Sequence, residues 1–438
     1  MSKQITSAQQ AVDAQTITLR DVKFATWICF FAWTFAVYDF VLFGNLLPVL
    51  AKALGWSDAR STAVNTWVTV GTAIVAFGIG PLIDRIGRRR GIILAVFGAG
   101  LGSLLTAAAG WVAGVTAGVG LVLLVLVRSA AGLGYAEQAA NATYLNELFA
   151  ETHADPARSR KRGRTYSLVQ SGWPVGSVLA AGSIYLLYPV GGWALCFAIA
   201  IIPSAAVAIA ARSLKESPRF AGLRAARVRA GQHAPLWNVL RGDSRRATLT
   251  IGTAFLLSWL GILTFSILGT SLLTAPSGKA IDFSNALAIL AVSNVTAFSG
   301  YLFHGWLGDR IGRRNTIAAG WLVSALAFGG MLLAPRGQVV PVVTLYSAGL
   351  FFLIGPFAAL VFFITESFPT STRGTGSSII NAAGQVGAVI GGFIITAALG
   401  AHQSWTHVAM VCGCLPVLAA AATILGARNI DPGSVRDD

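Results

Sequence analysis

The chain alternates between long apolar segments and short polar connections along nearly its whole length. Each apolar segment spans about 18–25 residues, the length of α-helix needed to cross the hydrocarbon core of a bilayer. The pattern therefore predicts an all-α membrane protein with twelve membrane-spanning helices. The predicted spans are residues 24–48, 62–83, 91–112, 119–148, 166–188, 190–211, 247–272, 284–307, 316–334, 340–365, 374–399 and 405–427.

Composition agrees with this pattern and argues against a soluble protein. The chain is 55% hydrophobic and 11% charged, whereas a soluble domain carries about 25% charged residues. Its 49 glycines suit transmembrane helices that pack closely. Residues 1–23 are polar and lack the apolar region of a signal peptide, so we expect a cytoplasmic tail. We interpret the four cysteines as packing residues, because all lie in apolar segments without a metal or disulfide spacing.

The distribution of positive charge predicts how the chain is oriented. The net charge is +15, and most Lys and Arg residues fall in the tails and in every second connection, as in cytoplasmic loops. Both termini and the connection 212–246 are therefore expected in the cytoplasm, with the protein in the plasma (inner) membrane. This distribution accounts for the net positive charge without a nucleic-acid partner. Residues 212–246 have a second possible role in contacting anionic lipid.

The chain repeats one plan twice. GPLIDRIGRRRG at 80–91 returns as GWLGDRIGRRNT at 305–316, and YLNE at 144–147 returns as FITE at 363–366. Because six predicted spans separate the members of each pair, we expect two six-helix bundles related by a parallel repeat. The predicted divisions are the tail 1–23, the first bundle 24–211, the linker 212–246, the second bundle 247–427 and the tail 428–438.

These motifs resemble those of a known family. The repeated GxxxDRxGRR loop resembles the signature of the major facilitator superfamily. The segments VYDFVLFGNLLPVLAKALG at 37–55, RSAAGLGYAEQAANATYLNE at 128–147, KESPRF at 215–220 and ITESFPTSTRGTG at 364–376 resemble the metabolite:proton symporters and, more distantly, the sugar porters. The resemblance implies two pseudo-symmetric bundles, alternating access and a central cavity that spans one and four both line.

Two opposite charges lie inside apolar spans, Asp39 in the first and Arg128 in the fourth. Each lies nine residues from the predicted outer end of its helix, or roughly 13–14 Å at 1.5 Å per residue. Charges in the bilayer interior are costly and persist where they are paired or hydrated. We therefore expect Asp39 and Arg128 to pair across the first bundle.

The predicted pair has two interpretations. In the first it is a switch: Arg128 stabilises the charged form of Asp39 and burial favours its neutral form, so protonation of Asp39 frees Arg128 for an anionic substrate. In the second it is a static ion pair that orders two helices. The cost of burying charge favours the switch.

Further polar and aromatic residues in the spans are candidates for the substrate path. Span four carries a polar stripe formed by Glu137, Asn141 and Tyr144 at helical spacing, with Gln138 beside it. Glu137 is a candidate second proton site, and the stripe suits interhelical hydrogen bonds equally well. The candidates for substrate contact, besides Arg128, are Tyr38, Gln138, Asn141, Gln170, Trp173, Trp259, Asn294, Asn381 and Gln385.

The repeated charged loops predict a cytoplasmic gate. In the family they resemble, such loops latch the two halves on the inner side, and Glu147 and Glu366 are candidate acceptors for their arginines. The alternative is that the positive charges of these loops only set the orientation of the chain in the membrane. The predicted gate residues are Asp84, Arg85, Arg88, Glu147, Asp309, Arg310, Arg313, Glu366 and Arg373.

No phosphate-binding loop or catalytic signature occurs in a usable context. The sequence therefore predicts a carrier without cofactor or enzymatic activity, functional as a monomer, that couples uptake of a small organic anion such as a carboxylate to a proton. A carrier of a neutral or zwitterionic metabolite (sugar, polyol, betaine) and an exporter remain alternatives, and a transporter-like sensor is a more distant one.

Overall fold

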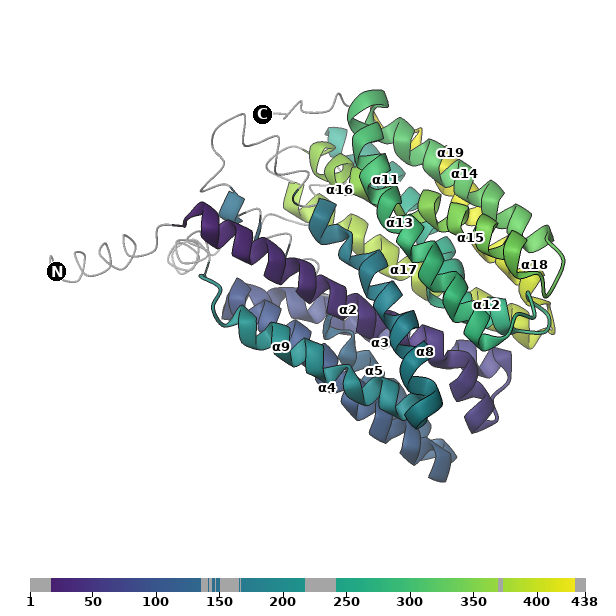
Figure 1. Cartoon of the computed structure of the whole chain (residues 1–438). Coiled ribbons are helices and arrows are strands. Elements are labelled where there is room, and N and C mark those ends of the chain that lie inside the picture. The colour runs from purple at the N-terminus through teal and green to yellow at the C-terminus, as the bar shows by residue number, and fades with distance from the viewer. Residues whose placement is uncertain are drawn as a thin grey trace, which may run out of the picture.

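The regular elements of the protein are all helices in the part of the chain that the structure describes. This computed structural model describes residues 17–134, 141, 144–145, 147–149, 165, 167–216, 242–368 and 373–429. Figure 1 shows the helices in two groups: those coloured purple to teal lie side by side, and those coloured green to yellow pack against them.

The first group comes from the N-terminal half of the chain. Its helices are α2 (Leu19–Leu54), α3 (Asp58–Ile86), α4 (Arg88–Val115), α5 (Ala117–Ala131), α8 (Gly172–Ile199) and α9 (Ile201–Ala211). Within it, α2 packs along α8, and α4 packs along both α5 and α9.

The second group comes from the C-terminal half. Its helices are α11 (Gly242–Ile262), α12 (Gly269–Thr274), α13 (Phe283–Ile311), α14 (Arg313–Leu333), α15 (Val339–Ile354), α16 (Phe357–Glu366), α17 (Arg373–Gly400), α18 (Trp405–Ala409) and α19 (Leu415–Ile424), with π-helical turns η2 (Leu263–Ile267) and η3 (Met410–Cys414). The two groups meet where α17 packs on α3 and α13 packs on α8.

The helix count can be compared with the twelve predicted spans only in part. Nine helices are long and apolar enough to cross a membrane among the described residues. One of them, Ser167–Ala211, covers the predicted spans five and six. It bends at Gly191 and Gly192, whose backbone angles are not helical, close to the break expected from the sequence. The number twelve therefore remains a prediction.

Large apolar side chains cover the outer surface of both groups. Trp111, Val190 and Leu333 are 72%, 80% and 79% exposed. A water-soluble protein rarely exposes apolar side chains over such a wide contiguous area, so this surface suits contact with lipid chains.

Helix α2 has strong signals at both ends. Thr18 and Asp21 form a capping box: the Thr18 hydroxyl accepts from the Asp21 amide, and the Asp21 carboxylate accepts from the Thr18 amide at 2.8 Å. Gly55 closes the helix in the left-handed conformation, with φ at 65°. These caps fix which 36 residues form α2 and so set the depth of Asp39.

Contacts between the two groups gather at the face predicted to be external. Three hydrogen bonds join them there: Thr270 to Asn45 at 3.0 Å, Trp405 to Asp58 at 3.0 Å, and Thr66 with Thr396 at 3.3 Å. Nearby, Gly44 lies so close to the backbone of Ile267 that a Cβ on Gly44 would overlap the Ile267 carbonyl oxygen. We call these contacts the outer closure; they hold this end of the interface shut.

We predict that Asp21 stabilises the protein above pH 4 through the start of α2. The ammonium of Lys215, 2.8 Å away, and the hydrogen bonds from Thr18 lower the pKa of Asp21 from 3.8 to about 2. A depressed pKa stabilises the fold above the unfolded value and ceases to do so as pH falls through the folded value. Asp21→Asn should therefore lower Tm by a constant amount from pH 7 to about 5, and the difference should shrink as the pH falls from 3.8 towards 2. Thermal unfolding in detergent measures it, and a gap that persists unchanged below that range would contradict the prediction.

Candidate functional site

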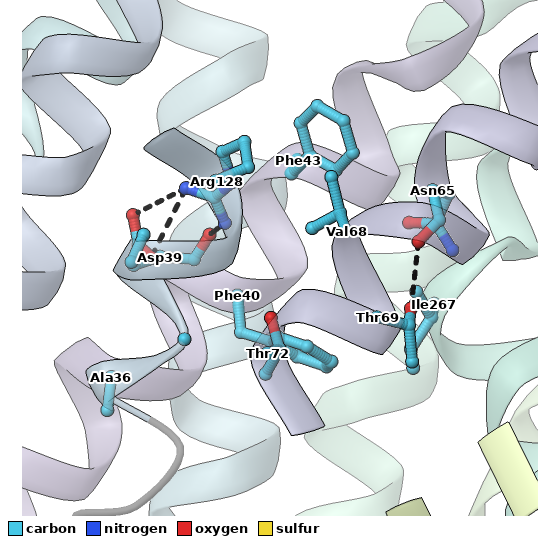
Figure 2. Close-up of a pocket in the computed structure, with 12 residues that line it drawn as sticks. Ala36, Asp39, Phe40, Phe43, Asn65, Val68, Thr69, Thr72, Arg128 and Ile267 are labelled. Atoms are coloured by element: carbon cyan, nitrogen blue, oxygen red, sulfur yellow. Dashed lines mark hydrogen bonds and ion pairs between the residues drawn. The ribbon is translucent and has the colours of Figure 1, made fainter. Parts of the chain in front are cut away.

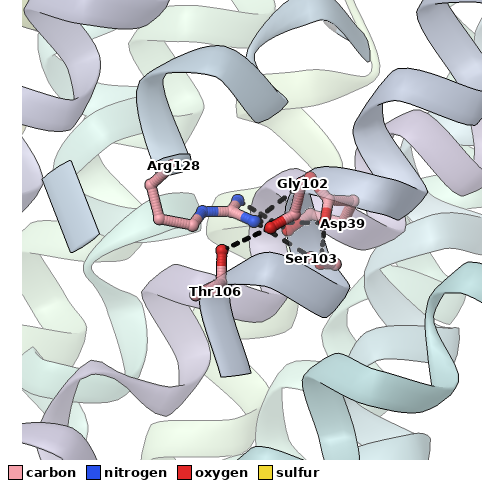
Figure 3. Close-up of polar contacts among 5 residues, drawn as sticks. All are labelled: Asp39, Gly102, Ser103, Thr106 and Arg128. Carbon is pink, nitrogen blue, oxygen red and sulfur yellow. Dashed lines mark hydrogen bonds and ion pairs between the residues drawn. The ribbon is translucent and has the colours of Figure 1, made fainter. Parts of the chain in front are cut away.

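Asp39 and Arg128 meet inside the first group of helices. Arg128 Nη1 lies 3.1 Å from Asp39 Oδ1 and 3.3 Å from Oδ2, and Arg128 Nη2 donates to the Asp39 backbone carbonyl at 3.0 Å. Ser103 of α4 donates its hydroxyl to Asp39 Oδ1 (Figure 3). Asp39 and Arg128 are only 2% and 3% exposed, so the pair is withdrawn from solvent.

Small residues allow α3 and α4 to approach α5, the helix that carries Arg128. A Cβ on Gly102 of α4 would meet Ala131 of α5, and one on Gly71 of α3 would overlap the Ser129 hydroxyl. Close contact at small residues is a common mode of helix packing in membranes. It places Ser103 and Arg128, from neighbouring helices, around the same carboxylate.

Two aromatic rings hold the guanidinium of Arg128 on its other sides. The Arg128 Cζ atom lies 5.2 Å from the centroid of Phe43 and 5.8 Å from that of Phe197. Such cation–π contacts stabilise a desolvated cation. Arg128 therefore keeps favourable contacts even if Asp39 becomes neutral.

A pocket lies beside the ion pair, and we call it the ion-pair pocket. It is bounded by α2, α3, α5 and Ile267 of η2 (Figure 2). Asp39 and Arg128 are the charged residues of its lining, and α3 supplies the polar side chains Asn65, Thr69 and Thr72. The lining is Ala36, Asp39, Phe40, Phe43, Asn65, Val68, Thr69, Thr72, Arg128, Ala131, Gly132 and Ile267.

A second pocket lies between the two groups of helices, and we call it the aromatic chamber. Its walls carry indole and phenyl rings from both groups, two amides and a phenol, with no charged side chain in the lining. The lining is Trp33, Gln170, Trp173, Phe255, Trp259, Ile262, Tyr301, Ile354, Phe357, Leu360, Val361, Ile364 and Asn381.

The rings of the aromatic chamber form a connected series. Trp173 lies 6.1 Å from Trp33 and 6.3 Å, at 90°, from Trp259, measured between ring centroids. Phe40 lies 6.2 Å from Trp173 and also lines the ion-pair pocket. Phe40 thus joins the lining of the ion-pair pocket to Trp173 in the wall of the aromatic chamber. The Trp173 Nε1–H has no hydrogen-bond partner among the described residues, and it is the kind of donor that a polar ligand group accepts from.

Four of the residues predicted to contact substrate line the aromatic chamber, namely Gln170, Trp173, Trp259 and Asn381. The other described candidates lie outside this lining. Tyr38 donates to Ser183 at 3.1 Å, Asn141 to the Cys29 carbonyl at 2.9 Å and Asn294 to the Leu290 carbonyl at 2.9 Å. Gln385 is buried at 7% exposure outside both linings. Tyr38, Asn141 and Asn294 thus bond a neighbouring helix or their own helix, whereas the Gln385 Nε2 has no hydrogen-bond partner among the described residues.

The predicted cytoplasmic gate is described in part. Arg88 lies 3.4 Å from Glu147 within the first group, and Arg313 lies 2.8 Å from Glu366 within the second. Asp309 near the end of α13 lies 3.8 Å from Arg313 at the start of α14, and Arg310 packs over the Trp306 ring at 4.2 Å. Each acidic partner thus belongs to the same group as its arginine.

Sequence reasoning did not single out Glu216. Its carboxylate accepts from the backbone amides of Arg88 at 3.0 Å and Arg89 at 3.4 Å. It therefore caps the start of α4, where Gly87 offers no side chain and the helix dipole favours an anion. The motif KESPRF at 215–220 is the sequence feature that could have indicated this role. It places an acidic residue just after the last helix of the first group, where the start of another helix can lie close by.

Several predicted residues lie outside the described part of the chain. They are Glu137 and Gln138, together with the side chains of Asp84, Arg85 and Arg373. Among the residues that were searched, no group of three or more His, Cys, Asp or Glu side chains is arranged to hold a metal ion.

The helical architecture and the buried pair define a polytopic membrane transporter. The family model of the Major Facilitator Superfamily matches residues 24–392 and 281–437. The chain therefore belongs to the major facilitator superfamily and is a multi-pass integral membrane protein.

Relatives and one solved structure agree with this assignment. A probable 4-methylmuconolactone transporter of Cupriavidus pinatubonensis is 29% identical over 80% of this chain and 77% of that protein. A gallate transporter of Pseudomonas putida is 27% identical over 91% of this chain and 90% of that protein. The crystal structure of a D-xylose–proton symporter matches the fold with a TM-score of 0.70, at 16% identity over 94% of this chain and 99% of the other.

We predict that the two members of the ion pair are unequal in their effect on stability. Removing one partner of a buried pair typically costs about 3–5 kcal/mol. Arg128→Met should cost less than Asp39→Leu, because a stranded carboxyl group can take up a proton whereas a stranded guanidinium cannot lose one. Thermal unfolding of the two variants measures the order.

The double variant Asp39→Leu/Arg128→Met is the control for this comparison. It strands no charge, so it should be more stable than Asp39→Leu alone. A double variant that is less stable than both single variants would show that a buried charge without a partner is not the cause of their lower stability.

Proposed function

We propose that this protein imports a small organic anion together with a proton, and that the anion is a carboxylate on a flat ring. The observation that carries the proposal is that the pocket beside the buried Asp39–Arg128 pair and the aromatic chamber between the two halves are joined by a ring contact, Phe40 of the first against Trp173 of the second. The names of the two relatives support the substrate class, because gallate and muconolactones are cyclic carboxylates.

The aromatic chamber suits a flat ring for physical reasons. Rings prefer offset or edge-to-face contacts with centroids about 4.5–7 Å apart, and the walls already present Trp173 and Trp259 at right angles. A planar substrate can stack on one indole while meeting the edge of the other. The Trp173 Nε1–H and the amides of Gln170 and Asn381 offer hydrogen bonds to a carboxylate or to ring hydroxyls.

Proton coupling follows from the charge balance of the pair. With Asp39 charged, Arg128 is neutralised and no net charge attracts an anion. When Asp39 takes a proton, the positive charge of Arg128 has no counterion, and an anion behind Phe40 then lowers the electrostatic energy. Binding of the proton and of the anion thus favour each other, as coupling requires.

The transport cycle can then proceed without ATP or a cofactor. Asp39 is protonated from the outer side, the anion enters the chamber, and the halves rock so that the outer closure forms. The anion and the proton leave on the inner side, and the Asp39–Arg128 pair reforms. The two-bundle architecture makes alternating access the expected motion.

Asp39→Asn should abolish accumulation of substrate against its gradient while sparing counterflow exchange. An amide of the same shape keeps the packing but cannot carry a proton. Uptake of labelled gallate, as the first probe, into proteoliposomes under an imposed pH gradient measures accumulation. Preloaded vesicles without a pH gradient measure counterflow.

Asp282→Asn is a matched control for this experiment. Asp282 caps α13 in an exposed loop, and Asn also caps helices well, so accumulation should match the wild type. Full accumulation by Asp39→Asn would remove the coupling proposal.

Trp173→Leu should lower affinity for an aromatic carboxylate by about twofold to twelvefold, because one aromatic contact contributes about 0.5–1.5 kcal/mol beyond the area it buries. Affinity for cyclohexanecarboxylate, which carries the same charge on a saturated ring, should fall less. Competition against labelled gallate measures both ligands.

The control is Trp111→Leu, which removes an indole 72% exposed on the lipid-facing surface and should leave both affinities unchanged. An equal loss for both ligands in Trp173→Leu would contradict selection of a flat ring.

A neutral polar substrate is the second candidate function. The aromatic chamber has no charged residue in its lining, and the fold also matches that of a sugar–proton symporter. A panel of labelled sugars and carboxylates in the same proteoliposomes separates the two candidates.

A further inference from the structure

Helix α3 presents one polar face to the ion-pair pocket. Asn65, Thr69 and Thr72 lie at helical spacing i, i+4 and i+7, and all three line the pocket. The Thr69 hydroxyl is satisfied by the carbonyl of Asn65 at 2.8 Å. The transport proposal above assigns no role to this face.

The amide of Asn65 has an unmet hydrogen bond. Asn65 is 4% exposed, and its Nδ2 has no partner among the described residues. A buried donor without a partner is unfavourable and calls for a ligand or an ordered water. Because Asn65 lines the pocket, a molecule in the pocket is the available acceptor.

The pocket lies directly beneath the outer closure. Figure 2 shows Asn65 and Ile267 away from the ion pair, with Phe43 and Val68 between. Ile267 belongs to the second group of helices and is seated against Gly44 of the first. Opening of the outer closure would move Ile267 away and connect the pocket to the external solution.

The charges around Asp39 restrict what the pocket can hold. Arg128 on α5 is the charged group that faces Asp39, α4 contributes the Ser103 hydroxyl, and the lining groups from α3 and η2 do not titrate. The pair is neutral overall, so the pocket attracts neither an anion nor a cation. Its hydroxyl and amide groups suit water.

We propose that the ion-pair pocket is the proton entry site of this protein, and that Asn65 and Thr72, seven residues apart on α3, hold successive waters along the path that delivers the proton to Asp39 from the outer side. The step is a simple transfer: a protonated water gives one proton to the Asp39 carboxylate, an O–H bond forms on Asp39, and neutral water remains. Ile267 plugs the site whenever the outer closure forms. The inference rests on the coupling role proposed for Asp39 and adds its route.

The test follows protonation of Asp39 directly and needs no substrate. The carbonyl stretch of a protonated carboxyl group that is missing in Asp39→Asn identifies the Asp39 signal in the infrared spectrum. After a rapid drop in pH, Asn65→Leu and Thr72→Val should each slow the growth of this signal by about tenfold, the factor that corresponds to one lost hydrogen bond to the delivering water. The final amplitude should match the wild type.

Two further variants separate this route from a general effect on folding. Gly44→Ala keeps the Ile267 backbone from packing against α2, so the carbonyl signal of protonated Asp39 should grow faster after the drop in pH. Thr26→Val removes a buried hydroxyl of α2 that bonds its own helix at 2.8 Å, away from the pocket, and should change nothing.

Unchanged rates in Asn65→Leu and Thr72→Val would overturn the proposed route while leaving proton coupling at Asp39 intact. An infrared spectrum that is identical in the wild type and in Asp39→Asn at every pH would overturn the coupling role itself, and the route with it.

Discussion

The cost of placing charge in a nonpolar interior governs this structure. Asp39 and Arg128 are nearly fully buried and hydrogen-bond to each other, with Ser103 as a third partner. Neither charge would be tolerated alone at this depth, so α2, α4 and α5 must be held in register around them. The glycine that lets α4 approach α5 closely, and the capping box that sets the start of α2, serve that requirement.

The same pair links two parts of the molecule that differ in character. On one side, the ion-pair pocket is polar and lies under the outer closure; on the other, beyond Phe40, the chamber is aromatic and spans both halves. A change in the charge of the Asp39 carboxyl group therefore changes the electrostatic potential in both the ion-pair pocket and the aromatic chamber.

Much of this arrangement could be predicted from the sequence, because it depends on periodicity and depth. Segment lengths located the helices, and the equal distances of Asp39 and Arg128 from their helix ends predicted that they would meet. Side-chain rotation could not be predicted in the same way. Tyr38 and Asn141 look like cavity residues in the sequence, yet each bonds a neighbouring helix.

The aromatic lining also escaped prediction in part. Trp33, Phe255 and Tyr301 line the chamber, but a ring in an apolar helix has the same sequence signature whether it faces a cavity, the core or lipid. The role of Glu216 at the start of α4 depends on a contact between segments 128 residues apart; the motif KESPRF shows an acid near the end of a bundle but not which helix it caps.

The depth of Asp39 has an electrical consequence. If the span ends near Pro48 as the sequence predicts, a proton that reaches Asp39 from the outer surface crosses roughly 13–14 Å of a core about 30 Å thick. The membrane potential contributes about 2.3 kcal/mol per elementary charge for every 100 mV, so nearly half of that energy acts on loading of the carboxyl group. Occupancy of this site would then respond to voltage as well as to acidity, even if one proton and one anion crossing together carry no net current.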